Sequence, residues 1–331
     1  MKKLITLSMV LLLLAGLVGC GSNQPAATKD KGSGKALQVG IIQIVEHPAL
    51  DAAREGFLET LKKNGYEEGK NLVVNYQNAQ GDANNLQPIA QKLASEKPDL
   101  ILAIATPSAQ AVAGATKDIP ILITAVTDPV GAKLVNSLQK PGTNVTGTTD
   151  MNPIKEQLEL LKQLVPGAKN IGVIYNAGEQ NSQTQVKKVK ELASGLGLEV
   201  TEATVTSTAE VMQATQSLVG KVQAIYVPTD NMVVSAANSV VQVADQNKIP
   251  IISGESSVVE KGALATIGID YKKLGEQTGE MAIRIINGEK PQDMPVESQK
   301  EFSIVINKKN ADKIGVTIPE EVLGKAAKVI K

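Results

Sequence analysis

Apolar runs alternate with amphipathic segments along the chain from residue 38 onward. Leu100 to Ala105 is a continuous apolar run, which is followed by the polar turn Thr106-Pro107-Ser108 and by a helix pattern of small residues. A strand that is apolar on both faces is typical of a buried parallel sheet. A polar turn between such a strand and a helix places hydroxyls and free backbone N–H groups at the carboxyl edge of the sheet. Ligands bind at that edge in open α/β folds.

A second stretch repeats this pattern in the other half of the chain. Val222 to Val240 contains a similar apolar run, a similar polar turn at Thr229-Asp230-Asn231, and again a helix of small residues. We interpret the two turns as opposite walls of one ligand cleft.

The hydrophobic pattern predicts a βαβα series in the first half of the chain. Such a series implies a parallel sheet with right-handed crossovers. The predicted strands are Val39–Val45, Asn71–Tyr76, Leu100–Ala105 and Pro120–Ala125, and the predicted helices are Pro48–Asn64, Ala83–Glu96 and Ser108–Thr116.

The pattern then restarts about 130 residues later, as Val39 corresponds to Ile171 and Pro120 to Pro250. A repeat of this length predicts two similar α/β lobes rather than a solenoid. The predicted strands of the second lobe are Asn170–Tyr175, Leu198–Thr204, Ala224–Val227 and the segment around Lys248–Ile252, and its helices are Asn181–Leu196 and Thr208–Val219.

Two β-branched stretches with glycines, Pro141–Thr149 and Ala263–Asp270, are expected to cross between the lobes as hinges. Tyr271–Asn287 is predicted to be a helix that packs back on the first lobe, and Glu301–Asn307 a last strand. The fold class is therefore α/β, with two Rossmann-like lobes. The N-terminal lobe is expected to span 37–144 plus about 265–290, and the C-terminal lobe 145–264 plus about 291–331.

Residues 1–20 have the features of an export signal. Lys2 and Lys3 precede an apolar core that is too short to span a bilayer well, and Leu17-Val18-Gly19-Cys20 follows. This order resembles a bacterial lipobox, which implies that Cys20 is lipidated; an ordinary secretory signal is the alternative. Residues 21–36 have the composition of a flexible tether.

The amino-acid composition and the absence of certain motifs limit the functions that we expect of the chain. The 331 residues carry 34 basic and 34 acidic side chains, so nothing indicates a general nucleic-acid surface. One His and one Cys leave no Cys/His metal cluster, and no cofactor is expected. The chain has no nucleotide-binding loop and no G-x-S-x-G elbow, so we do not expect an enzyme.

Several motifs together resemble the solute-binding lipoproteins of bacterial ABC importers, which have the type I periplasmic-binding fold. The resemblance is greatest to the branch associated with aromatic amino acids such as tryptophan and tyrosine. It implies a two-lobed protein that closes on one small solute and presents it to a membrane permease. The motifs are Pro48-Ala49-Leu50-Asp51 before Gly56-Phe57, Ala105 to Gln110, Val126 to Ala132, Tyr175-Asn176 with Glu179, Asn181 and Ser182, Pro228 to Asn231, and Gly268 to Tyr271.

An amino-acid ligand requires donors for its carboxylate and an acceptor for its ammonium. Thr106, Ser108 and the N–H of Ala109 are the candidate donors, because a helix N-terminus stabilises an anion. Asp230, on the opposite lobe, is the first candidate acceptor and Asp128 the second. Further candidate contacts are His47, Thr127, Asn176, Glu179, Asn181, Ser182 and Asn231.

Each candidate also has a structural explanation. Thr106, Ser108 and Asp230 could only cap helices, Asp128 could only start a turn, and His47 could be a surface residue at a helix start. A sensor that reports to a membrane kinase, or a nucleoside or sugar receptor, remains an alternative function. The expected protein is a monomer, anchored by lipid on the extracytoplasmic face of the cell membrane.

Overall fold

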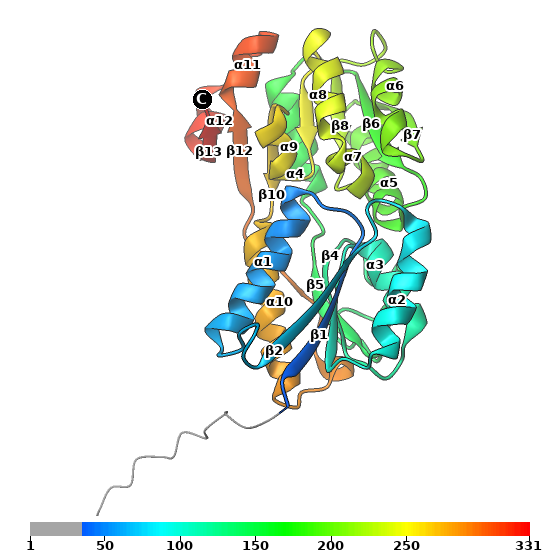
Figure 1. Cartoon of the computed structure of the whole chain (residues 1–331). Coiled ribbons are helices and arrows are strands. Elements are labelled where there is room, and N and C mark those ends of the chain that lie inside the picture. Colours follow the sequence, from blue (N-terminus) through cyan, green and yellow to red (C-terminus); the bar gives the residue numbers. More distant parts are fainter. Residues whose placement is uncertain (1–34) are drawn as a thin grey trace, which may run out of the picture. The chain divides into compact units, whose positions relative to one another are not determined.

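The computed structural model describes residues 35–331, and residues 36–331 form one compact unit. The expected signal segment, Cys20 and nearly all of the tether lie outside the described residues. Within the described part, two parallel sheets with helices on their faces form the two lobes that the repeat predicts (Figure 1).

The first sheet has the strand order β11-β5-β4-β3-β1-β2, and every neighbouring pair in it is parallel. β3 lies in the middle of this sheet and is buried along its whole length. The strands are β1 (Leu37–Gln43), β2 (Leu72–Asn78), β3 (Leu100–Ile104), β4 (Ile121–Val126), β5 (Val145–Thr149) and β11 (Glu297–Ser298).

Helices α1 and α10 pack side by side in the first lobe, and α2 and α3 form a second contacting pair (Figure 1). The helices of this lobe are α1 (Pro48–Lys63), α2 (Leu86–Ser95), α3 (Thr106–Ala115) and α10 (Tyr271–Ile286), with the short 3₁₀ helices η1 (Ala83–Asn85) and η3 (Pro291–Asp293).

The α1–α10 contact is close because glycines lie in it. A Cβ on Gly56 would lie 2.2 Å from the carbonyl oxygen of Lys272, and a Cβ on Gly275 would lie 1.9 Å from that of Ala53. The two helices run in the same direction, so both begin at the same end of the lobe. That end carries His47, which precedes α1, and Tyr271, which begins α10.

The second sheet has the strand order β13-β12-β10-β9-β8-β6-β7, in which only the β10–β12 pair is antiparallel. Its strands are β6 (Asn170–Asn176), β7 (Glu199–Val205), β8 (Ala224–Val227), β9 (Ile251–Ser253), β10 (Ala265–Gly268), β12 (Ser303–Asn307) and β13 (Ala326–Ile330). Its helices are α4 (Ile154–Leu164), α5 (Gln180–Gly195), η2 (Thr208–Glu210), α6 (Val211–Gln216), α7 (Asn231–Ser235), α8 (Ala237–Gln246), α9 (Ser256–Lys261), α11 (Lys308–Ile314) and α12 (Glu320–Lys325).

Alternation along β8 divides the core of the second lobe into two layers. Ala224 and Tyr226 pack with α4 and α5, whereas Ile225 and Val227 pack with α6, α8 and α9. Successive side chains of a strand point to opposite faces. This burial on both faces explains why the strand is an uninterrupted apolar run in the sequence.

The crossings between the lobes are shorter than the sequence indicates. Pro141–Thr149 and Ala263–Asp270 were expected to be crossings, but β5 completes the first sheet and β10 the second. The chain passes between the lobes at 150–153, 269–270 and 299–302. The lobe boundaries at 145 and 265 are therefore wrong by a few residues, and β11 returns to the first sheet although 291–331 was assigned to the C-terminal lobe.

Most predicted elements are present, with ends shifted by one to three residues. α10 packs on α1 of the first lobe, as predicted. α3 begins at Thr106, two residues before its predicted start. The helices α4, α9, α11 and α12 and the strand β13 have no counterpart among the predicted elements.

Within residues 35–331 no helix has the length and apolar character needed to cross a bilayer.

Candidate functional site

Polar residues follow neighbouring strands at the carboxyl edges of both sheets. β1, β3 and β4 are adjacent in the first sheet, and β6, β8 and β9 in the second. The residues proposed from the sequence lie at or just after the ends of five of these six strands, and none of them follows β9. They are His47 after β1, Thr106, Ser108 and Ala109 after β3, Thr127 and Asp128 after β4, Asn176 at the end of β6 with Glu179, Asn181 and Ser182 after it, and Asp230 and Asn231 after β8.

In the first lobe, the wall formed by the turn after β3 has unused hydrogen-bonding groups. Thr106 and Ser108 are fully buried, and neither hydroxyl has a partner within the described chain. Ala105 has a φ of 75°, which non-glycine residues rarely adopt, and this conformation turns the chain abruptly from the strand into α3. The two hydroxyls therefore lie at a helix N-terminus without capping it.

The N–H of Ala109 does not remain free, contrary to the expectation. It donates to the carbonyl of Ala105 at 3.1 Å, because α3 starts two residues early. The N–H groups of the first turn of a helix have no partner inside the helix. The backbone donors of this turn therefore belong to Thr106 and Ser108.

His47 is buried in the same region, and neither of its ring nitrogens has a partner at hydrogen-bond geometry. Burial, together with the nearby Lys261 ammonium, lowers the pKa of His47 to about 3, and the side chain of Asn231 offsets this only in part. The imidazole is therefore neutral at pH 7, so one nitrogen can accept a hydrogen bond.

In the structure, the Asp230 carboxylate forms hydrogen bonds within its own lobe and is not left free, as a proposed ammonium acceptor would be. Its carboxylate caps α7 by accepting from the N–H of Val233 at 2.8 Å. It also accepts from the N–H of Asn176 and the hydroxyl of Ser182, each at 2.6 Å. Desolvation raises the pKa of Asp230, and these donors oppose the rise. The carboxylate thus fixes the ends of β6 and β8 against each other.

Glu179 forms a second buried hydrogen-bond network in the second lobe, next to that of Asp230. Its carboxylate accepts from the side chain of Asn181 at 3.1 Å and from the N–H and side chain of Asn231. Desolvation and the negative charge of Asp230 raise the pKa of Glu179 well above 4.5. Among these residues, the amide oxygen of Asn181 is left without a partner.

Asp128 starts a turn, as the alternative interpretation held. Its carboxylate accepts from the N–H of Gly131 at 2.9 Å, and the residue is partly exposed. A Cβ on Gly131 would lie 3.0 Å from the side-chain nitrogen of Gln180, so this turn of the first lobe meets the start of α5 in the second.

Gln185 joins the two lobes more directly. Its side-chain nitrogen donates to the hydroxyl of Thr229 at 2.6 Å and approaches that of Thr127, in the first lobe, at 3.4 Å. Its oxygen accepts from the N–H of Thr229 at 3.1 Å. The carboxyl edges of the two sheets are therefore in contact.

A very small cavity of about 10 Å³, roughly the room that one water molecule needs, lies between the lobes, and both contribute to its lining. Three of its polar residues, Asp150, Glu255 and Tyr271, were not proposed from the sequence. Glu255 follows the apolar strand β9, so the same rule that selected Asp230 could have found it. Asp150 was missed because β5 was not recognised as a strand. The lining is completed by His47, Leu50, Ala125, Thr229, Asn231 and Val234.

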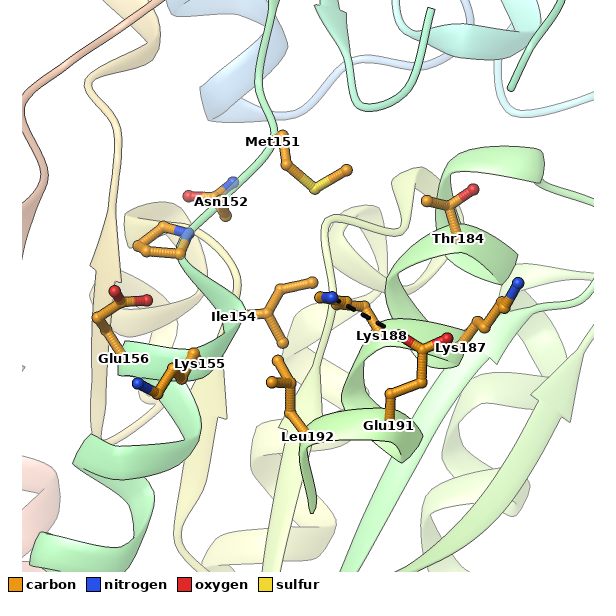
Figure 2. Close-up of a pocket in the computed structure, with 11 residues that line it drawn as sticks. Met151, Asn152, Ile154, Lys155, Glu156, Thr184, Lys187, Lys188, Glu191 and Leu192 are labelled. Carbon is orange, nitrogen blue, oxygen red and sulfur yellow. Dashed lines mark ion pairs between the residues drawn. The ribbon is translucent and has the colours of Figure 1, made fainter. Parts of the chain in front are cut away.

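A larger and more open pocket lies elsewhere in the second lobe, between α4 and α5 (Figure 2). Its rim carries Lys155, Lys187 and Lys188, and Lys188 forms an ion pair with Glu191 at 3.6 Å. Of the seven unpartnered buried polar atoms in residues 35–331, only the oxygen of Asn152 belongs to this pocket. All seven are His47 Nδ1 and Nε2, Thr106 Oγ1, Ser108 Oγ, Asn152 Oδ1, Gln180 Oε1 and Asn181 Oδ1.

Unpartnered buried polar atoms are few in folded proteins, and each requires an explanation. Here six of the seven follow β1, β3 or β6 at the edges where the sheets meet. The arrangement fits a ligand enclosed between the lobes.

Comparison with known proteins identifies the family. Residues 38–330 match the ABC transporter substrate-binding protein family. The chain belongs to that family. It is 50% identical over 311 residues to a tyrosine-binding protein of Clostridioides difficile, covering 92% of this chain and 90% of the relative.

Two solved relatives differ in how well they superpose on this structure. The ABC domain from Streptococcus pneumoniae in complex with L-Trp is 41% identical and has a TM-score of 0.87. A ligand-free, open substrate-binding protein with adhesive properties from Clostridium difficile is 52% identical but has a TM-score of only 0.68. Each match covers 89% of this chain and 100% of the relative.

The more similar sequence thus has the less similar structure, so sequence divergence does not explain the difference. As a whole, this substrate-binding protein superposes better on the L-Trp complex than on the open, ligand-free protein. More distant solute-binding proteins, such as a glucose-galactose binding protein from Geobacillus stearothermophilus (16% identical, TM-score 0.60) and a myo-inositol-bound protein from Bacillus halodurans (16%, 0.63), share the type I periplasmic-binding fold alone.

Proposed function

We propose that this protein is the extracytoplasmic, lipid-anchored binding component of an ABC importer. It closes on an aromatic amino acid and delivers it to a permease. The observation that carries this proposal is the set of unpartnered buried polar atoms on both lobes. A group from each lobe must contact the same solute if the solute is to favour the closed arrangement.

The first lobe supplies neutral donors for a carboxylate. Thr106 and Ser108 contribute hydroxyls and N–H groups at the N-terminus of α3, where the helix dipole favours an anion. No arginine or lysine lines the interlobe cavity among the described residues. The carboxylate would therefore be held by hydrogen bonds and not by a formal ion pair.

The two most informative relatives support the class of solute. One is named a tyrosine-binding protein and the other was solved in complex with L-Trp. The lipobox-like sequence at Cys20 supports anchoring to the membrane, where a permease would receive the solute.

A thermal-shift panel tests the proposal directly. The full chain is heated with each of the twenty amino acids, and with common nucleosides and sugars at the same concentration. We expect tyrosine, tryptophan or both to raise the melting temperature, because a ligand that binds only the folded state stabilises it by mass action. If a sugar or nucleoside stabilises the protein and no amino acid does, the proposed solute class is wrong.

A further inference from the structure

Two buried carboxylates line the interlobe cavity on its hinge side. Asp150 is 3% exposed and Glu255 is 1% exposed. Asp150 accepts from the hydroxyls of Thr127 at 3.0 Å and Tyr271 at 2.7 Å. Glu255 accepts from the N–H and the hydroxyl of Ser257. Since a carboxylate can accept about four hydrogen bonds, each retains unused capacity.

Neither carboxylate has a cationic partner within ion-pair distance among residues 35–331. Lys261 is the nearby cation, but its ammonium donates to the carbonyl of Val234 and acts on Glu255 only at longer range. Burial raises the pKa of both Asp150 and Glu255. Two buried carboxylates without a bound cation are costly, because burial removes the water that stabilises their charge.

His47 supplies the independent observation that a ligand belongs here. It lines the same cavity, is more than nine-tenths buried, and both of its ring nitrogens lack partners. Its burial and the neighbouring Lys261 keep the imidazole neutral, so it offers a lone pair. Asp150, Glu255 and His47 therefore present three acceptors to one enclosed space. An ammonium has three N–H donors.

Asp230 does not share these properties. It is absent from the lining of the cavity, and its two oxygens accept from three protein donors at 2.6 to 2.8 Å. Because protein donors already stabilise the Asp230 carboxylate, it depends less on an added cation than the Asp150 carboxylate does.

Asp150 also belongs to the hinge. It lies in the crossing at 150–153, and its bond from Tyr271 ties this crossing to the start of α10, just after the crossing at 269–270. Gln299 donates to the carbonyl of Asp270 at 2.6 Å and accepts from its N–H, which ties in the third crossing. A ligand bound to Asp150 would thus be linked to all three crossings through these hydrogen bonds.

We propose that the α-ammonium of the bound amino acid is held by Asp150, Glu255 and His47, so that the hinge itself recognises the ammonium. This assignment rests on the proposed function and replaces Asp230 as the acceptor. The solute then lies with its ammonium toward the hinge and its carboxylate toward α3. A carboxylic acid of the same shape without the ammonium binds poorly, since it leaves the two carboxylates unpaired.

The test measures binding of L-tyrosine and L-tryptophan by calorimetry, each beside its des-amino analogue, 3-(4-hydroxyphenyl)propionate or indole-3-propionate. The proteins are the wild type, Asp150→Asn and Glu255→Gln. Asp245→Asn is the matched control, since this carboxylate of the second lobe pairs with Lys313 outside the cavity. Each change preserves side-chain shape, and melting of the free protein verifies folding.

We expect Asp150→Asn to lower amino-acid affinity by tenfold or more and to leave affinity for the des-amino analogue equal or higher. Glu255→Gln should act in the same direction, and the control should behave as the wild type. Equal losses for both ligands would show that Asp150 serves only structure, and unchanged amino-acid affinity in both variants would also overturn the assignment. A wild type that binds no amino acid would instead contradict the proposed function.

A second measurement needs no variant. Wild-type affinity for the amino acid should decrease as pH is lowered, because protonated carboxyls of Asp150 and Glu255, whose pKa values are raised by burial, no longer attract the ammonium. Affinity for the des-amino analogue should hold or increase. Lys261 is the neighbouring cation. The neighbouring His47 and Tyr271 do not change protonation between pH 7 and about 5, because the pKa of His47 is lowered to about 3 and that of Tyr271 is raised. Parallel pH profiles for the two ligands would contradict the assignment.

Discussion

The turn that follows β3 in the first lobe and the turn that follows β8 in the second lobe are similar in sequence but differ in chemistry. Thr106 and Ser108 are buried with unpartnered hydroxyls, whereas the half-buried Thr229 and the buried Asp230 form hydrogen bonds within their own lobe. The first turn has groups available for a ligand, and the second is already complete. An internal repeat therefore keeps the position of a turn without keeping its role.

The physical reason lies in the number of bonds that each side chain accepts. A carboxylate accepts about four, so Asp230 caps its helix and also binds Ser182 and Asn176. A hydroxyl that neither caps nor meets a facing donor stays unused. The turn after β8 thus provides rigid support, and the turn after β3 provides hydroxyls that a solute can satisfy.

Removal of the Asp230 carboxylate should have the largest effect. In Asp230→Ala the N–H groups of Asn176 and Val233 and the hydroxyl of Ser182 lose their acceptor. We expect the free energy of unfolding to fall by roughly 2–4 kcal/mol, measured by chemical denaturation of the ligand-free protein. Asp230→Asn, which retains one acceptor oxygen, should lose less. A variant that is as stable as wild type but binds the solute weakly would restore Asp230 as the ammonium acceptor.

Removal of the corresponding side-chain groups in the first lobe should lower ligand affinity and leave stability nearly unchanged. Ser108→Ala and Thr106→Val remove hydroxyls that have no partner in the protein, so stability should change by less than about 0.5 kcal/mol. Amino-acid affinity should fall by about tenfold or more, because each lost hydrogen bond to a charged group costs about 1.5–3 kcal/mol. Calorimetry and denaturation of the same samples separate the two effects. A loss of stability without a loss of affinity would remove the distinction between the two turns.

A smaller effect concerns the dependence of stability on pH. The pKa of Glu179 is raised in the folded protein by desolvation and by Asp230, from an ordinary value of 4.5. The folded state therefore keeps a proton that the unfolded state has released, and stability decreases as pH rises above about 4.5. Glu179→Gln should flatten this decrease in denaturation experiments between about pH 5 and 8.

Asp150, Asp230 and Glu255 have pKa values raised in the same direction, so some slope should remain in Glu179→Gln. His47 acts oppositely, since its lowered pKa makes protonation below about pH 6.5 favour the unfolded state. A steeper slope in the variant than in the wild type would show that Glu179 is ionised in the folded protein.

The sequence by itself determined the two lobes and the location of the polar turns at the carboxyl edges of their sheets. Buried parallel strands need apolar residues on both faces, so β3 and β8 can be recognised in the sequence as uninterrupted apolar runs. The polar turns that follow them must lie at the carboxyl edges, because parallel strands end together. Local pattern therefore selected Thr106, Ser108 and His47, whose side-chain atoms are unpartnered in the structure.

Only the tertiary structure decided which of these polar groups are already satisfied. The donors to Asp230 come from Ser182 and Asn176, about fifty residues away in sequence, and no local pattern specifies such pairs. Asp150 lies beside Tyr271, 121 residues later, because the close contact between α1 and α10 brings the start of α10 to the hinge. Residue types and periodicity specify faces and edges, whereas the balance of buried charges depends on which distant side chains meet.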